Sequence, residues 1–286
     1  NEGLLPISIT TQYLCGIDYT PKIASAQIKS SILLAGLGAG GVTKLSEKYL
    51  TRNHTEIMMK NMGIDINIID SQIILKQIKH KLNPIDIYIP GDPSTASFFA
   101  AAALLLNKEI ILEKILLNET RIGFFKIIEQ MGAKIEYINV KTSFGEKVGD
   151  IRVIPNQLHS IIIDKKIISS IIDEIPIIAI LASQANGQTK LTGGIELRYK
   201  ESDRIRAICS NLNNMGAKID EFNDGFIIHG KSELNGTKIK TYKDHRIAMA
   251  FSIAGLITNG KTHLDDEKCI EFSCPEFFSL LKELIN

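Results

Sequence analysis

The sequence predicts a layered α/β (α+β) protein built from a repeated unit, with apolar helices buried beneath mixed sheets. Three observations support this class. Four long apolar runs recur at intervals of roughly 70 to 80 residues. A short strand-like segment follows each run. In three of the four cases, an amphipathic helix ending in Met-Gly and a pair of hairpin-like strands come next.

The four apolar runs carry few polar residues on any face, which is typical of helices buried on all sides. They occupy residues 25–41, 92–107, 173–187 and 244–260. Each run begins with a short polar residue that can cap a helix, namely Ser25, Asp92, Asp173 or Asp244. For the three acids, a structural cap and a catalytic carboxylate are alternative roles.

The strand-like segments that follow the runs are residues 41–45, 108–113, 187–192 and 260–265. The amphipathic helices fall within residues 51–66, 119–135 and 200–219. These three segments align on an arginine and on a final Met-Gly, whose glycine suits the left-handed position after a helix. Hairpin-like strands include residues 150–155 and 225–234, and the fourth unit ends instead in an amphipathic helix at residues 274–285.

Composition excludes several classes of protein. The chain has 286 residues, 44% of them hydrophobic, and a net charge of +1, so no basic excess indicates a nucleic-acid partner. The apolar runs are too short to predict a membrane span. The four cysteines form no CxxC pair and have no metal-finger spacing. We therefore expect free thiols in a reducing compartment, the cytoplasm, and no metal site.

Residues 195–208 concentrate charges of both signs at the start of a helix predicted for residues 202–216. Lys200 and Arg204 lie at the N-terminal end of this helix, where the helix dipole disfavours cations. A bound phosphate or carboxylate would offset them. A local salt bridge between Glu201 and Arg204 is the alternative.

Two further helix starts carry unusual polar residues. His245 and Arg246 occupy the first turn of an otherwise apolar helix, where either an anionic ligand or a capping network would explain them. Asp173 precedes an all-apolar helix, where burial can tune a carboxylate for proton transfer. If the repeats stack in parallel, these helix starts converge and their dipoles attract anions. The sequence therefore predicts a site for a polyanionic ligand.

Eight motifs together resemble the 5-enolpyruvylshikimate-3-phosphate synthase family. In chain order they are SAQIKS, TRNHTE, GDPSTASFF, NETR, DEIPIIA, KESDRI, MGA and DHRIAMA. The resemblance covers nearly the whole chain but corresponds to the C-terminal two thirds of a usual member. The family's opening segment, with a Lys-Ser pair, an arginine and a Gly-rich loop, has no counterpart here.

The resemblance implies two domains of the enolpyruvyl transferase fold, each made of three βαβαββ units, with the active site between them. Residues 1–91 would form the latter part of the N-terminal domain, and residues 92–286 the C-terminal domain. The first domain would then be truncated, and the four repeats would be the last four of six. A full-length member is expected to be a monomer.

The resemblance also implies a reaction. The enolpyruvyl group of phosphoenolpyruvate is transferred to the 5-hydroxyl of shikimate 3-phosphate through a tetrahedral ketal, and phosphate is released. No metal or organic cofactor is implied. Asp173 would handle the proton of the 5-hydroxyl, and Glu201 would deliver and later remove the proton at the methylene carbon.

Further residues match the family's substrate-binding positions. Arg204 and Arg246 would clamp phosphoenolpyruvate, since planar guanidinium groups suit carboxylate and phosphate, and the adjacent His245 is a further candidate for substrate binding. The positions that would face shikimate 3-phosphate are Ser25, Ala26, Gln27, Arg52 and Lys200. Ala26 stands where some members have a second serine.

The other charged residues of the segment 195–208 are not assigned to substrate binding or catalysis. Asp203 is expected to orient its neighbours. Arg198 and Arg206 are expected to be surface charges.

Two rival functions remain open. One is the related enolpyruvyl transferase that acts on UDP-N-acetylglucosamine, although the KESDR and DHR motifs argue against it. The other is a non-catalytic remnant that binds anions. We expect the chain alone to show negligible turnover, and the family's opening segment to restore it.

Overall fold

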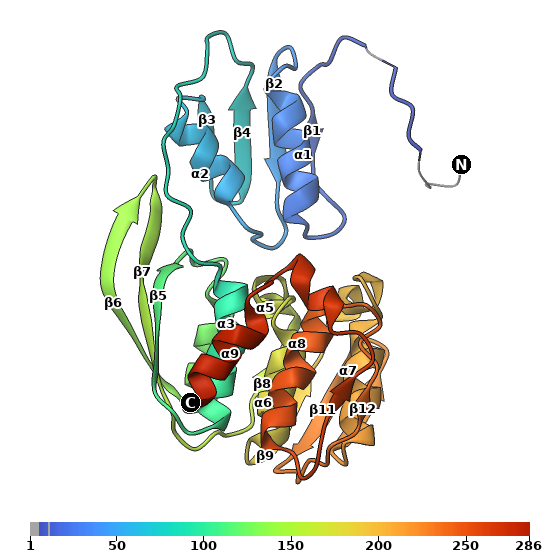
Figure 1. Ribbon diagram of the computed structural model, residues 1–286. Coiled ribbons are helices and arrows are strands. Elements are labelled where there is room, and N and C mark those ends of the chain that lie inside the picture. The colour runs from blue at the N-terminus through green and yellow to red at the C-terminus, as the bar shows by residue number, and fades with distance from the viewer. Residues whose placement is uncertain (1–5, 11) are drawn as a thin grey trace. The chain divides into compact units, whose positions relative to one another are not determined.

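One β-α-β-α-β-β pattern accounts for most of the chain (Figure 1). The computed structural model describes residues 6–10 and 12–286. The chain divides into two compact units, Asn1–Ile87 and Tyr88–Asn286. The family resemblance places the division a few residues later, after residue 91. Residues 1–5 and 11, which belong to the expected first domain, lie outside the described residues.

The first unit contains one copy of the pattern. Its elements are β1 (Asp18–Tyr19), α1 (Ala26–Gly36), β2 (Val42–Ser46), α2 (His54–Asn61), β3 (Ile66–Ile69) and β4 (Gln72–Lys76). The strands form one sheet in the order β1-β2-β4-β3. β1 runs parallel to β2, while the other pairs are antiparallel. A small apolar core lies under the sheet, formed by Leu33, Leu45, Met59, Ile64, Ile66, Ile73 and Leu75.

The second unit repeats the pattern. The next copy comprises α3 (Pro93–Leu105), β5 (Ile110–Leu116), α4 (Gly123–Gln130), β6 (Lys134–Ser143) and β7 (Glu146–Ile154). A third comprises β8 (Ile162–Ile163), α5 (Lys165–Ile171), α6 (Ile175–Gln184), β9 (Gly187–Leu191), the 3-10 helix η1 (Ile195–Tyr199), α7 (Arg204–Asn214), β10 (Lys218–Phe222) and β11 (Gly225–Gly230). The last part comprises β12 (Lys238–Ile239), α8 (His245–Ala254), the 3-10 helices η2 (Gly255–Ile257) and η3 (Lys268–Phe272), β13 (His263–Leu264) and α9 (Phe277–Ile285).

Strand pairing is the same in each copy. The sheets have the orders β5-β7-β6 and β10-β11-β9-β8, and β12 pairs with β13 in parallel. The parallel strand that starts the α3 copy is reduced to a single bridge between Gly91 and Ile115. The predicted layered repeat with mixed sheets is therefore confirmed.

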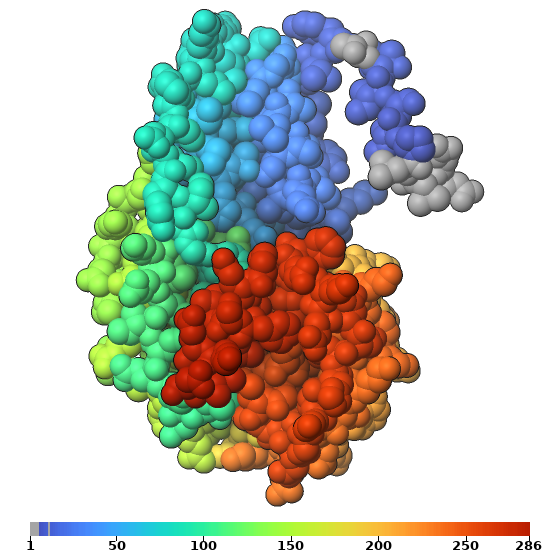
Figure 2. Space-filling view, viewed as in Figure 1, coloured from blue at the N-terminus to red at the C-terminus, as the bar shows by residue number. Residues whose placement is uncertain are grey.

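Helices α3, α6 and α8 form the core of the second unit and pack against one another. All residues from Ile175 to Ser183 of α6 are buried, and Ala100 to Ala103 of α3 have no exposed surface. Small alanine side chains let neighbouring helices approach closely. Figure 2 shows the C-terminal segment covering part of this unit's surface, and within it α9 packs on α3 through Phe277 and Phe99, whose ring centroids are 5.6 Å apart.

Helix α1 differs from the other three apolar runs. Only Lys29, Leu33 and Gly36 are buried, and Leu34 is 60% exposed. The prediction that this run is buried on all sides is therefore wrong. The physical reason is that, within the described residues, α1 covers a sheet on one side and the other three apolar helices belong to the second unit.

The helix ends follow the sequence signals with one exception. Ser25, Asp92 and Asp244 cap α1, α3 and α8, each accepting a hydrogen bond from a backbone N–H of the first turn. Asp173 does not cap α6, because the N-cap position belongs to Glu174, whose side chain makes no capping bond. Helix α7 starts at Arg204, slightly later than expected, and Asp203 caps it.

The three Met-Gly endings adopt the predicted left-handed conformation. Gly63, Gly132 and Gly216 have φ angles of 84°, 112° and 96°. A side chain at such a position strains the backbone even where space is available.

We expect Gly216→Ala to lower the free energy of unfolding by about 1–2 kcal/mol. An added Cβ at Gly216 would lie 3.4 Å from Asn235 Nδ2 and 3.5 Å from Glu233 O, which is ordinary contact, so the cost is conformational. Gly38→Ala is the control, since its Cβ would meet only Ala35 O at 4.0 Å and its φ is not positive. Urea unfolding measures both variants, and equal losses would contradict the backbone explanation.

Within the described residues, no helix by itself has the length and apolarity to cross a membrane. Helices α5 and α6 meet the criteria only together, as a pair bent by 112°. In this pair α6 is part of the buried core.

Candidate active site

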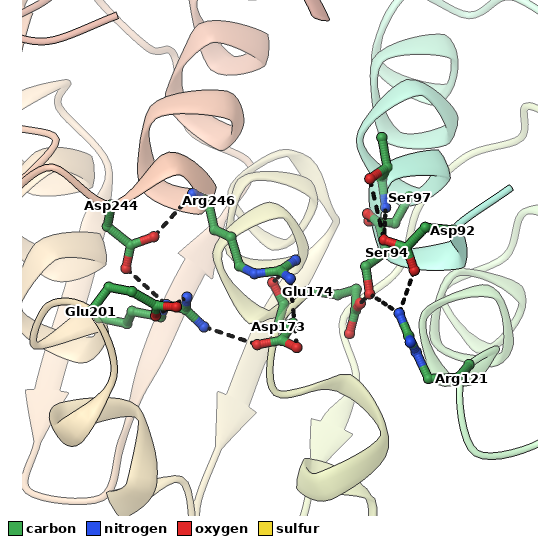
Figure 3. A network of polar contacts seen from close by, with 11 residues as sticks. Asp92, Ser94, Ser97, Arg121, Asp173, Glu174, Glu201, Asp244 and Arg246 are labelled. Atoms are coloured by element: carbon green, nitrogen blue, oxygen red, sulfur yellow. Dashed lines mark hydrogen bonds and ion pairs between the residues drawn. The ribbon is translucent and has the colours of Figure 1, made fainter. Parts of the chain in front are cut away.

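The N-terminal ends of α3, α6, α7 and α8 are joined by a network of polar contacts in the second unit (Figure 3). The contributing residues are Asp92 and Ser94 from α3, Asp173 and Glu174 from α6, Glu201 and Arg204 at α7, and Asp244 and Arg246 from α8. The predicted gathering of helix starts is therefore observed for these helices. It places both signs of charge at the positive ends of several helix dipoles.

Arg204 is at the centre of this network. Its side chain has no exposed surface and contacts three carboxylates. Nε donates to Asp244 Oδ2 at 2.9 Å, Nη1 to Asp173 Oδ1 at 3.2 Å, and Nη2 to Glu201 Oε2 at 2.6 Å. Burial alone would lower the pKa of this guanidinium, but the carboxylates, Asp244 foremost, raise the pKa above its ordinary value. Arg204 is therefore a permanent buried cation.

Asp244 is the fully buried partner of Arg204. It also accepts hydrogen bonds from Ser202 Oγ at 2.9 Å and from the backbone N–H of Arg246 at 3.0 Å. Burial would raise the pKa of this carboxyl, but Arg204 and the hydrogen bonds hold the pKa below its usual value. Asp244 thus caps α8 and fixes the orientation of Arg204 at the same time.

The two predicted catalytic carboxylates share this one guanidinium. Asp173 is 14% exposed and also faces Arg246, with 3.6 Å between Arg246 Nη2 and Asp173 Oδ2. The carbonyl oxygen of Asp173 accepts a bond from Arg246 Nη1 at 3.4 Å. Glu201 is 52% exposed, and within the described residues Arg204 is the ion-pair partner of its carboxylate. One acid is therefore enclosed by cations, while the other reaches solvent.

The other predicted residues of this unit lie around the same network. Lys200 is exposed, and within the described part of the chain it has no ion-pair partner. Arg246 is 15% exposed. His245 is half-buried, and burial, with Arg246 acting in the same direction, lowers the pKa of its imidazole. His245 is therefore neutral at physiological pH and offers hydrogen bonds rather than charge.

The sequence left two explanations open for the cations at the start of α7: a bound anion, or a salt bridge between Glu201 and Arg204. The salt bridge between Glu201 and Arg204 is present. Arg204 is also fully buried behind its carboxylate partners, so a direct contact with a ligand would use the guanidinium N–H groups left over from three ion pairs. Arg246 and Lys200 are the more accessible cations.

The remaining predicted residues belong to the first unit. Ser25 caps α1, Ala26 is the first residue of α1, and Gln27 is exposed on its first turn. Arg52 is half-buried in the loop that precedes α2.

Lys29 ties this loop to the first turns of α1. It is 1% exposed and contacts Glu47 Oε2 at 3.0 Å, Glu56 Oε1 at 2.8 Å and the carbonyl oxygen of Thr51 at 3.4 Å. A buried ion pair of this kind favours a specific arrangement more than it adds stability. Lys29 therefore fixes the loop next to Arg52.

Sequence reasoning missed three residues of the network. Ser94 Oγ donates a short hydrogen bond to Glu174, and Arg121 Nη2 donates to Ser94 Oγ at 2.9 Å and to Asp92 Oδ1. The sequence contained a signal for Arg121, because an arginine lies at or just before the start of each of the three helices that end in Met-Gly: Arg52 before α2, Arg121 before α4 and Arg204 at α7. Nothing in the sequence marked Ser94 or Glu174 as partners.

The expectation that Arg198 is a surface charge is wrong. Its side chain is 17% exposed and donates to Asp203 Oδ2 at 2.7 Å and to Glu221 Oε1 at 3.1 Å. It also donates to the carbonyl oxygens of Asn223 and Phe222, both at 2.6 Å. Arg198 therefore joins the start of α7 to the turn between β10 and β11, a contact between segments that are distant in sequence.

This arrangement can bind an anion and transfer protons. Accessible cations lie beside two carboxylates in unlike environments, which is the usual basis for separate acid and base roles. Within the described residues, no group of three or more His, Cys, Asp or Glu side chains is placed to hold a metal ion.

Solved structures define the class of the fold as that of the enolpyruvyl transferases. The enolpyruvyl transferase NikO from Streptomyces tendae matches with a TM-score of 0.66 over 89% of this chain and 58% of its own, at 18% identity. At that identity the likeness concerns the fold alone.

The chain belongs to the EPSP synthase (3-phosphoshikimate 1-carboxyvinyltransferase) family, whose model matches residues 1–281. It is 49% identical over 98% of its length to the 3-phosphoshikimate 1-carboxyvinyltransferase of Thermodesulfovibrio yellowstonii, and 42% identical over 99% to that of Aquifex aeolicus. An EPSP synthase structure from Acinetobacter baumannii matches with a TM-score of 0.87 at 39% identity over 96% of this chain.

The chain is shorter than these relatives. It spans 65% of the Thermodesulfovibrio protein, 67% of the Aquifex protein and 63% of the Acinetobacter chain.

Proposed function

We propose that this chain carries the C-terminal part of an EPSP synthase active site, which transfers the enolpyruvyl group of phosphoenolpyruvate to the 5-hydroxyl of shikimate 3-phosphate. The observation that carries the proposal is the bridge from Asp173 through Arg204 to Glu201. It joins the two acids that the family resemblance assigns to proton transfer. Arg246 beside Asp173 supplies an accessible cation for a carboxylate or phosphate.

In the addition step, Asp173 accepts the proton of the 5-hydroxyl while that oxygen forms a bond to C2 of phosphoenolpyruvate. Glu201 gives a proton to the methylene carbon, and the tetrahedral ketal results. In the elimination step, Glu201 removes a proton from the methyl carbon, the C2–O bond to phosphate breaks, and the double bond forms again. Asp173 then returns the hydroxyl proton to the departing phosphate or to solvent. Asp173 enclosed by cations suits the first role, and the solvent-accessible Glu201 suits reversible protonation.

Binding of the two anionic substrates is assigned to the accessible polar residues. Arg246, together with Arg204 and neutral His245, would contact phosphoenolpyruvate. Lys200 and, in the first unit, Ser25, Ala26, Gln27 and Arg52 would contact shikimate 3-phosphate.

We further infer that the first unit corresponds to the latter part of the N-terminal domain and the second unit to the C-terminal domain of a monomeric enzyme. Cys15, Cys209, Cys269 and Cys274 are all free thiols, which supports a cytoplasmic location. Burial raises the pKa of the Cys209 thiol to about 12, so this group is unreactive at neutral pH.

The names of the matched relatives favour shikimate 3-phosphate over UDP-N-acetylglucosamine as acceptor. A non-catalytic, anion-binding remnant is the second alternative. It would bind phosphoenolpyruvate without turnover even when the rest of an EPSP synthase is supplied.

Phosphate release tests the proposal. We expect negligible release from the chain alone, and at least about 100-fold faster release once it is joined to the unmatched third of the Thermodesulfovibrio relative, because added charged groups complete the anion site. The joined protein with UDP-N-acetylglucosamine as acceptor is the control. Normal rates from the chain alone would contradict the expectation that it is inactive by itself, whereas a joined protein that folds but releases no phosphate would contradict the proposed function.

A further inference from the structure

The acidic pair before α6 has two different environments. Asp173 contacts the guanidinium groups of Arg204 and Arg246. Glu174, the next residue, is 2% exposed, and within the described residues no Lys or Arg forms an ion pair with it. Its Oε1 accepts a hydrogen bond from Ser94 Oγ (Figure 3). A buried carboxyl with a neutral partner thus lies directly beside a carboxylate with charged partners.

Ser94 connects this carboxyl to a second part of the site. Its hydroxyl accepts from Arg121 Nη2 at 2.9 Å, and Arg121 also pairs with Asp92, the cap of α3. The line from Arg121 through Ser94 to Glu174 therefore joins the residues before α4 to the first turns of α3 and α6. Each member is held by at least one neighbour, so the start of α6 has little freedom to move.

The charges around Glu174 favour its neutral form. Burial raises the pKa of its carboxyl first, and the adjacent Asp173 raises it further. The bond from Ser94 and the more distant guanidinium groups of Arg246 and Arg121 oppose the shift without cancelling it. Burial in a less polar position disfavours the charged form of an acid, and a neighbouring carboxylate adds to this effect.

We propose that Glu174 is a positioning residue for Asp173: as a neutral, buried acid bound to Ser94, it fixes the start of α6 and leaves the guanidinium groups of Arg204 and Arg246 to Asp173. The role in catalysis rests on the proposed function. The protonation of the pair is a property of the folded chain and can be measured without any turnover.

The variant Glu174→Gln tests this proposal, because an amide keeps the oxygen that Ser94 bonds and removes the titration. Glu174→Leu removes both the hydrogen-bond acceptor and the titrating group. The control is Glu233→Gln, which changes an exposed glutamate. In ¹³C carboxyl spectra of the 286-residue chain, the signal absent from Glu174→Gln is expected to titrate above the ordinary glutamate range near pH 4.3.

The change of folding stability with pH is an independent test, and the direction of this change is predicted. A folded-state pKa raised above the unfolded value means that the folded chain holds a proton the unfolded chain has lost, so stability falls as pH rises from the unfolded pKa to the folded one. The urea midpoint of the wild type should therefore decrease relative to that of Glu174→Gln across this interval. The Glu233→Gln control should stay parallel to the wild type.

Activity of the joined protein then tests the link to Asp173. At neutral pH, Glu174→Gln should have a kcat close to that of the wild type, and its plot of kcat against pH should lack the transition caused by the titration of Glu174. Glu174→Leu should lower kcat about 10-fold with a smaller change in KM. An ordinary titration of Glu174, parallel midpoints, or equal kcat for all variants would overturn the inference. A wild-type joined protein without phosphate release would count against the proposed function, whereas the titration and the midpoints would still decide the protonation of Glu174.

Discussion

Replacing Arg204 by methionine is expected to lower the free energy of unfolding by about 3–5 kcal/mol. The reason is the charge left behind. Arg204 has no exposed surface and is the direct partner of Asp173, Glu201 and Asp244. Methionine fills similar space but leaves the fully buried Asp244 without its cation. Because many domains have only 5–15 kcal/mol of stability in total, such a loss is a large fraction of it.

Arg206→Met is the matched control for this experiment. Arg206 lies two positions further along α7, is 67% exposed and pairs with Glu221 at 2.9 Å. A surface pair of this kind contributes at most about 1 kcal/mol. Urea unfolding of both variants at pH 7 measures the difference. Similar small losses for the two arginines would show that the buried network does not stabilise the fold.

Replacing Asp173 by asparagine is expected to slow phosphate release by the joined protein about 10²–10⁴-fold, the usual loss when a general base is removed. The fold should change little. The asparagine oxygen can still accept from Arg204, the amide nitrogen takes the place of the oxygen that faces Arg246 at 3.6 Å, and Arg204 keeps the carboxylates of Glu201 and Asp244. We therefore expect activity and stability to separate in this variant.

Asp164→Asn is the control for Asp173→Asn. Asp164 caps α5 by accepting from the backbone N–H of Lys166 at 2.7 Å, and asparagine caps about as well as aspartate. This variant should keep both rate and stability. Phosphate release and urea unfolding are measured on the same preparations. Unchanged release from Asp173→Asn would remove Asp173 from the mechanism, and a loss of folding would assign it a structural role instead.

The fold could be predicted largely from local signals. Apolar runs, capping residues and Met-Gly endings act within one helix, so each can be read without knowledge of distant contacts. The same signals failed for α1, because burial depends on how many helices surround it. They also failed at Asp173, where a short polar residue before a helix makes ion pairs with Arg204 and Arg246 rather than a cap.

Residues of the candidate site could be named from the sequence, but the contacts between them could not. Charge density around residue 200 and the family motifs indicated Glu201, Arg204 and Arg246. Their partners are set by contacts between segments far apart in the chain, such as Arg204 with Asp244 and Ser94 with Glu174. Arg198 shows the same limit, since its carbonyl partners near residue 222 belong to a turn that no local pattern connects to it.

An arginine recurs at or just before the start of α2, α4 and α7, and its surroundings differ at each place. Arg204 is enclosed by three carboxylates, Arg121 links Asp92 and Ser94 at the start of α3, and Arg52 lies in a loop beside the buried Lys29. Similar positions of a repeated unit therefore give one residue type different contacts, because the neighbouring segments differ. A repeated fold can thus offer several similar side chains to one protein, while the environment of each side chain sets the chemistry that it can perform.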